Sequence, residues 1–233
     1  MPPSPRAGSV KADLKSMGKK VLLVEGPDDW HAINNLIHKS TGAFPSYELG
    51  YCNNDNGVLD ILSGMTEASN QTQSILGAVL DADLGKEGKA GDSGIQARIR
   101  SLKGRLEKYY AIPDLFAGEG LILPPTNESD RDRLPVLGIW LMPDNERDGI
   151  FEDLLCAAMA PESEKYIAGV VDQATVDKMT SFRNVERSKA IVKTYIAWQD
   201  PNKKNLGEAI GSHFDNLDPA CRSFLNWLEC LFS

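Results

Sequence analysis

Histidine and cysteine, which mark many metal and nucleophile sites, are scarce in this sequence. The 233 residues include three histidines and four cysteines. The cysteines lack the paired spacing of a metal site and the density of a disulfide scaffold, so we interpret them as thiols in a reducing cytoplasm. The histidines show no ligand spacing and no catalytic triad, so we interpret them as structural or exposed.

Long apolar runs are also missing. No segment approaches the roughly 18 consecutive apolar residues of a membrane-spanning helix, so we expect no membrane span. The first residues are polar and proline-rich with no apolar segment behind them, which argues against a signal peptide. A phosphate-loop fingerprint and a nucleophile-elbow serine are absent too. These absences favour a cytoplasmic protein outside the P-loop and serine-hydrolase classes.

Positive charge is in the minority. Lysine and arginine number 25 against 33 aspartates and glutamates, giving a net charge of −8. This balance argues against binding nucleic acid by simple charge attraction. It leaves room for an enzyme that acts on nucleic acid through a local basic patch.

Apolar patterns with strand and helix periods alternate along the first two thirds of the chain. We expect strands at 20–24, 47–51, 75–80 and 136–142, and helices at 28–38, 58–65 and 95–106. A proline-rich loop is expected around 121–125. This alternation predicts an α/β fold: a three-layer, Rossmann-like, mostly parallel sheet flanked by helices.

The predicted domain organisation has three parts. Residues 1–18 read as a mobile N-terminal tail, residues 19–160 as the α/β domain, and residues 161–233 as a helical extension packed on that domain. The last part shows no convincing strand pattern.

Acidic residues end two of the predicted strands. Glu25 follows the first strand, and Asp81 and Asp83 follow the strand at 75–80. Parallel strands deliver their C-terminal ends to one edge, so we expect these carboxylates to converge. Two unit charges about 5 Å apart repel by roughly 3 kcal/mol at an effective dielectric of about 20. A hard cation such as Mg²⁺ or Mn²⁺ would remove that cost, so we predict a metal site.

Further acids and bases lie near this predicted edge. Asp29 is either a ligand or an acid favoured by the dipole of its helix, and the same choice applies to Glu152. Lys86 and Lys89 belong to a glycine-rich loop that either contacts phosphate or is an ordinary loop. Arg98 lies on a basic helix that is either a phosphate track or solvated surface.

These motifs, in this order, resemble the TOPRIM domain of topoisomerases, bacterial primases and overcoming-lysogenization-defect nucleases. That domain has a Glu-Gly-x-x-Asp pattern after its first strand and an Asp-x-Asp after its third. The matching residues here are Glu25, Gly26, Asp29, Asp81 and Asp83. The resemblance implies that Glu25, Asp81 and Asp83 are catalytic and hold Mg²⁺ or Mn²⁺.

The chain is also similar to an uncharacterised family of short stand-alone TOPRIM-like proteins. The shared motifs are Met142-Pro143-Asp144-Asn145, Gly149 with Glu152-Asp153, Lys189-Ala190, and Thr194-Tyr195-Ile196-Ala197-Trp198-Gln199. In the related nucleases, additional acids complete a two-metal site and a later lysine assists catalysis. By position, the resemblance assigns Asp144 and Glu152 as further metal ligands and Lys189 as the assisting lysine.

The expected function is metal-dependent phosphodiester chemistry on DNA or RNA, in particular a TOPRIM-type nuclease. The chain lacks the ATPase half of many such nucleases and the other domains of a topoisomerase, so a co-encoded ATPase or defence partner is a possible companion. One alternative is a non-catalytic TOPRIM-like module in a defence or repair complex. Another is a nucleotide-sugar transferase, against which Glu25 argues.

Overall fold

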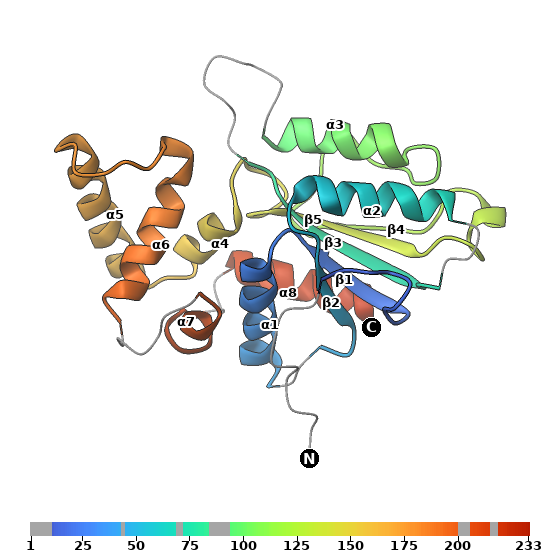
Figure 1. Ribbon diagram of the computed structural model, residues 1–233, viewed down its shortest axis with the longest axis horizontal. Helices are drawn as coiled ribbons and strands as arrows, with labels where there is room; N and C mark the ends of the chain where they lie inside the picture. The colour runs from blue at the N-terminus through green and yellow to red at the C-terminus, as the bar shows by residue number, and fades with distance from the viewer. Residues whose placement is uncertain (1–10, 43–44, 69–71, 84–93, 200–205, 215–218) are drawn as a thin grey trace.

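The computed structural model describes residues 11–42, 45–68, 72–83, 94–199, 206–214 and 219–233. It contains a five-stranded sheet with helices on both faces (Figure 1). The strands are β1 Lys20–Val24, β2 Glu48–Tyr51, β3 Ile75–Asp81, β4 Leu121–Leu123 and β5 Val136–Met142. The helices are α1 Pro27–Thr41, α2 Asp55–Glu67, α3 Ile95–Leu106, α4 Phe151–Ala157, α5 Pro161–Val176, α6 Arg187–Ala197, α7 Leu206–His213 and α8 Pro219–Phe232. The predicted α/β class is confirmed.

The strand order is β2-β1-β3-β5-β4, and the first four strands in this order are parallel. The chain moves outward from β1 to β2 and then crosses back to β3 on the other side of β1. Right-handed crossovers in opposite directions place their helices on opposite faces of a sheet. Accordingly, α1 covers one face, and α2 covers the other with α3.

Residues 121–123 form the edge strand β4, where a loop was expected around 121–125. Leu121–Leu123 pair antiparallel with Leu137–Ile139 of β5. Three residues are too few to show a strand period, and the prolines that follow them indicate a loop. The pairing is therefore set by the neighbouring strand rather than by a local sequence signal.

Among the described residues after β5, the regular elements are all helices, as expected. In Figure 1, α1 and α8 lie on the sheet face opposite α2 and α3, while α5 and α6 stand beside α4 at the end of the sheet. Helix α7 packs against α1, and α6 packs against α4 and α5. The C-terminal helices thus share one apolar core with α1 and the sheet.

Two paired glycines let α8 approach the sheet closely. Gly77 of β3 and Gly138 of β5 are direct partners in the ladder. A Cβ atom at Gly138 would lie 2.2 Å from a Leu231 methyl carbon, and one at Gly77 would lie 3.0 Å from the same carbon. Side chains of α8 occupy this space, which fixes the helix over the centre of the sheet.

Residues 11–18 belong to the fold, although the sequence analysis assigned them to a mobile tail. The backbone N–H of Ala12 donates to the carbonyl of Tyr51 at 2.8 Å, beside the outer strand β2. Met17 is buried, and the Gln73 amide donates to the carbonyl of Leu14 at 2.8 Å. The remainder of the expected tail, residues 1–10, lies outside the described residues.

Helices of the described ranges are all too short or too polar to cross a membrane.

Candidate metal centre

The candidate site lies where the strand order reverses. Strands β1 and β3 are neighbours, but the chain leaves them towards opposite sides of the sheet. In open α/β sheets, ligands bind at this switch point, outside the carboxyl ends of the strands. Glu25 follows β1 directly, and Asp81 is the last residue of β3. The fold therefore brings together two acids that are 56 residues apart in sequence.

Glu25 and Asp81 are joined through the backbone. The Glu25 Oε1 atom accepts a hydrogen bond from the Asp81 N–H at 2.8 Å. The Asp81 Oδ1 atom in turn accepts one from the Phe151 N–H, at the start of α4, at 2.9 Å. Each carboxylate thus has one oxygen held by a backbone donor.

Asp29 supplies a third carboxylate and is also a helix cap. Its Oδ2 atom accepts the Gly26 N–H at 2.8 Å, the interaction expected of an acid in the first turn of α1. Asp29, Glu25 and Asp81 line one cavity of about 10 Å³, together with apolar side chains. A space of this size is about that of one water molecule.

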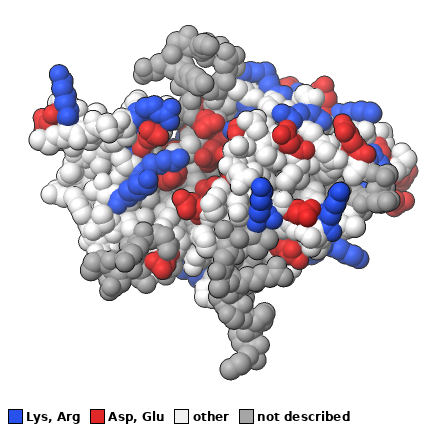
Figure 2. All heavy atoms as spheres, viewed as in Figure 1, with Lys and Arg blue, Asp and Glu red and all other residues white. Residues whose placement is uncertain are grey.

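Glu152 and Lys189 complete the cluster from the C-terminal helices. Burial raises the pKa of Glu152 and of Asp29, and the Lys189 ammonium partly opposes both shifts. Lys189, on α6, is therefore close enough to act on both acids. Figure 2 shows acidic side chains gathered where the N-terminal ends of α1 and α4 meet the sheet, with basic side chains over α6 beside them.

The electrostatics of the cluster disfavour its fully ionised form. Burial raises the pKa of Glu25 from 4.5 to about 7, against the opposing effects of the Asp81 N–H and Arg98. Burial also raises the pKa of Asp81 well above its usual range, and the charges of Glu25, Asp29 and Glu152 raise it further. Perturbed carboxyl groups in a cleft are typical of functional sites.

Asp83 lies outside the cavity, although it was expected to share a face with Asp81. Its φ angle is +62°, so the chain leaves the extended conformation there, and Gly149 N–H donates to its carbonyl at 3.0 Å. The Asp83 carboxylate forms an ion pair with Arg98 at 3.1 Å. The two-residue period of a strand does not extend to this position, which explains the difference from the expectation.

Arg98 is a buried cation that binds protein groups. Its Nε donates to the carbonyl of Asp81 at 3.0 Å, and its NH1 pairs with Asp55 at 2.9 Å. With the Asp83 contact, the guanidinium joins α2, α3 and the end of β3. Asp55 is not among the predicted site residues, because an acid in the first turn of a helix has an ordinary explanation in the helix dipole.

The other predicted site residues have different surroundings. The Asp144 carboxylate accepts the N–H groups of Glu146 and Arg147 and pairs with the Arg147 guanidinium, so it stabilises the turn in which it lies.

Asp153 caps α4 through the Ile150 N–H. Lys86 and Lys89 lie outside the described residues. Asp148, which is likewise not among the predicted site residues, accepts the Ile95 N–H at the start of α3.

A hard divalent cation fits the donor chemistry of this cluster. Among the described residues, no group of three or more acidic, histidine or cysteine side chains is arranged so that it could hold a metal ion. Mg²⁺ does not require such a group, since it keeps several waters and is typically held by one or two carboxylates together with substrate phosphates. The oxygens of Glu25 and Asp81 that backbone donors do not engage are suited to that role.

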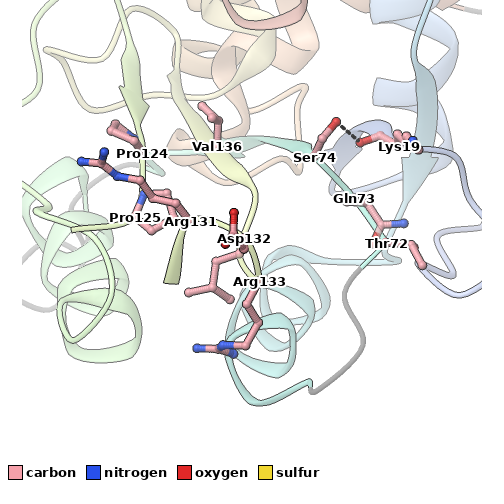
Figure 3. Close-up of a pocket in the computed structure, with 11 residues that line it drawn as sticks. Lys19, Thr72, Gln73, Ser74, Pro124, Pro125, Arg131, Asp132, Arg133 and Val136 are labelled. Carbon is pink, nitrogen blue, oxygen red and sulfur yellow. Dashed lines mark hydrogen bonds between the residues drawn. The ribbon is translucent and has the colours of Figure 1, made fainter. Parts of the chain in front are cut away.

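A larger hollow, of about 360 Å³, lies at the opposite edge of the sheet. Figure 3 shows the residues that line this hollow: Arg131, Asp132 and Arg133, from the segment before β5, lie across from Lys19 and the segment before β3. Arg133 is engaged by the carbonyl of Thr66 and by the Asp130 carboxylate. This hollow has mixed charge and lies away from the strand-order switch, so we place the candidate site at the acidic edge.

A family model described as "Protein of unknown function (DUF3226)" matches residues 19–233. The chain belongs to this family. The matched residues include every acid of the candidate site and the helices that carry Glu152 and Lys189. No curated protein and no solved structure matches the chain.

Proposed function

We propose that this DUF3226 protein performs metal-dependent phosphodiester chemistry on nucleic acid, as a TOPRIM-type nuclease that uses Mg²⁺ or Mn²⁺. The observation that carries the proposal is the convergence of Glu25 and Asp81 at the strand-order switch, with Asp29 and Glu152 around them. Such a cluster is costly to ionise without a cation, and a bound divalent cation would remove that cost.

The roles of the residues follow from their positions. Glu25 and Asp81 would hold the ion, with Asp29 and Glu152 as outer acids. When bound, the metal neutralises charge on a phosphate and activates water for attack. Lys189 balances the acids from α6 and would stabilise negative charge on the substrate, because a protonated lysine donates hydrogen bonds but has no lone pair for a metal.

Cleavage assays with the whole chain test this proposal. Single-stranded, double-stranded and supercoiled substrates are incubated with Mg²⁺, Mn²⁺ or EDTA, using wild type and Asp81→Asn. We expect wild type to cut in Mn²⁺ and the variant to lose cutting while its fold stays intact. Asp114→Asn is a matched control, since Asp114 is exposed and pairs only with Lys103 among the described contacts.

The result that would overturn the nuclease is also defined. If wild type cuts none of these substrates in either metal, even with a co-encoded partner added, the chain is better explained as a non-catalytic binding module of a defence or repair complex.

A further inference from the structure

The two aspartates of the Asp-x-Asp motif have different surroundings, and Arg98 contacts both residues. Asp81 faces the cavity with Glu25, whereas Asp83 is paired with Arg98. The Arg98 side chain is 7% exposed, while that of Asp83 is 58% exposed. The arginine is thus fixed inside the protein, and Asp83 is drawn to it from the surface.

We propose that Arg98 is a positioning residue that keeps Asp83 out of the acidic cluster and fixes the carbonyl end of β3, so that Asp81 alone of the motif serves the ion. The inference rests on the proposed function and deepens it. It reverses two expectations from the sequence, in which Asp83 is a ligand and Arg98 binds substrate.

The geometry supports this role in two ways. First, Arg98 Nε donates to the Asp81 carbonyl at 3.0 Å, so the same side chain that holds Asp83 also orients the residue carrying the cavity carboxylate. Second, Asp55 at the start of α2 accepts from NH1 at 2.9 Å and fixes the guanidinium from the other side. A planar fork with several donors can make these three contacts together, and an ammonium cannot reproduce them.

Arg98 also affects the charge of the site. It is a cation close enough to lower the pKa of Glu25. It would therefore repel a divalent ion while favouring the ionised form of a ligand. Replacing it by a neutral residue removes that repulsion and releases Asp83 as an additional acid near the ion.

The test compares Arg98→Gln, Arg98→Lys, Asp83→Asn and the double variant Arg98→Gln/Asp83→Asn with wild type. Mn²⁺ affinity is measured by calorimetry, and cleavage by kcat and KM. Arg105→Gln is the matched control, because Arg105 also joins α3 to α2, through Asp60 at 3.1 Å, but at the surface.

For Arg98→Gln, we expect Mn²⁺ to bind about threefold more tightly or better, since a repelling charge is gone. We expect kcat to fall by about 10- to 100-fold, as for other residues that orient metal ligands. Adding Asp83→Asn should recover part of the lost kcat. Arg98→Lys should retain less of the wild-type kcat than the double variant. Asp83→Asn alone should still bind Mn²⁺ and cut. A purely structural role would lower affinity and activity together, without recovery in the double variant.

Two kinds of failure are distinguishable. If wild type binds and cuts, but Asp83→Asn abolishes Mn²⁺ binding or Arg98→Gln behaves like Arg105→Gln, the positioning role is overturned and the nuclease remains. The role is also overturned if the double variant is no more active than Arg98→Gln. If wild type neither binds Mn²⁺ nor cuts, both proposals are overturned.

Discussion

The Glu25 carboxylate accepts the backbone N–H of Asp81 at 2.8 Å, across the boundary between the first and third strands. This bond ties the charge of one strand end to the backbone of the next. It lowers the pKa of Glu25, but burial outweighs it, so the pKa still rises to about 7. Ionisation of the buried carboxylates is therefore unfavourable unless a cation compensates their charge.

The raised pKa of Glu25 predicts that stability falls as pH increases. Between its ordinary value of 4.5 and about 7, the folded state binds a proton that the unfolded state has lost. The contribution is fully present below pH 4.5 and disappears as pH rises through 7, and it amounts to about 3 kcal/mol. Urea unfolding in EDTA at pH 5 and pH 8 measures it. In Glu25→Gln the difference between the two pH values should shrink, and an unchanged difference would contradict the assignment.

Metal binding should oppose this loss of stability at high pH. A divalent ion that neutralises the cluster removes the cost of ionisation, so Mn²⁺ should raise the melting temperature more at pH 8 than at pH 5. Stabilisation grows with occupancy and reaches about 2.7 kcal/mol at a free ion concentration of roughly 100 times the dissociation constant. Equal shifts at both pH values, or shifts that persist in Asp81→Asn, would show that the ion binds elsewhere.

Lys189→Ala should slow cleavage without weakening Mn²⁺ binding. Lys189 lowers the pKa of both Asp29 and Glu152, so its removal should raise both pKa values. The acid limb of the pH–rate profile should therefore move to higher pH. Lys193→Ala, an exposed change on the same helix, provides the control. A drop in kcat with no movement of the profile would argue that Lys189 acts only on the substrate.

Gly138→Ala should destabilise the fold by about 1–3 kcal/mol, because its Cβ would collide with Leu231 and the interior has little room to adjust. Gly169→Ala is the control. Gly169 lies in α5 with no atom within 4 Å of an added Cβ, so alanine should stabilise the helix by about 0.5–1 kcal/mol. Shifts in the urea midpoint measure both effects. Similar midpoints for the two variants would mean that α8 can move away from the sheet.

The sequence was sufficient to predict the elements whose signals are local. Four apolar runs mark the four parallel strands, and the rule that parallel strands end at one edge is enough to bring Glu25 and Asp81 together. The antiparallel strand β4 was not predicted, because three residues are too few to show a strand period and their pairing depends on β5.

The site was predictable only where backbone topology decides it. Asp83 leaves the face of Asp81 because its backbone turns and Gly149 holds it there. Arg98 pairs with Asp55, 43 residues away, and such a partner cannot be read from a basic helical face. Lys189 was assigned from a resemblance, since nothing in its local sequence indicates that α6 packs beside α4.

Helix α8 follows every strand in the chain, yet its side chains occupy the space over Gly77 and Gly138 at the centre of the sheet. While the protein is being synthesised, β1, β3 and β5 can therefore pair long before the apolar surface of β3 and β5 is covered. An exposed apolar sheet face of this kind favours association between chains. Newly made chains should consequently depend on chaperones until α8 docks, and a frameshift that removes only this helix should yield aggregates even though every acid of the cluster is still encoded.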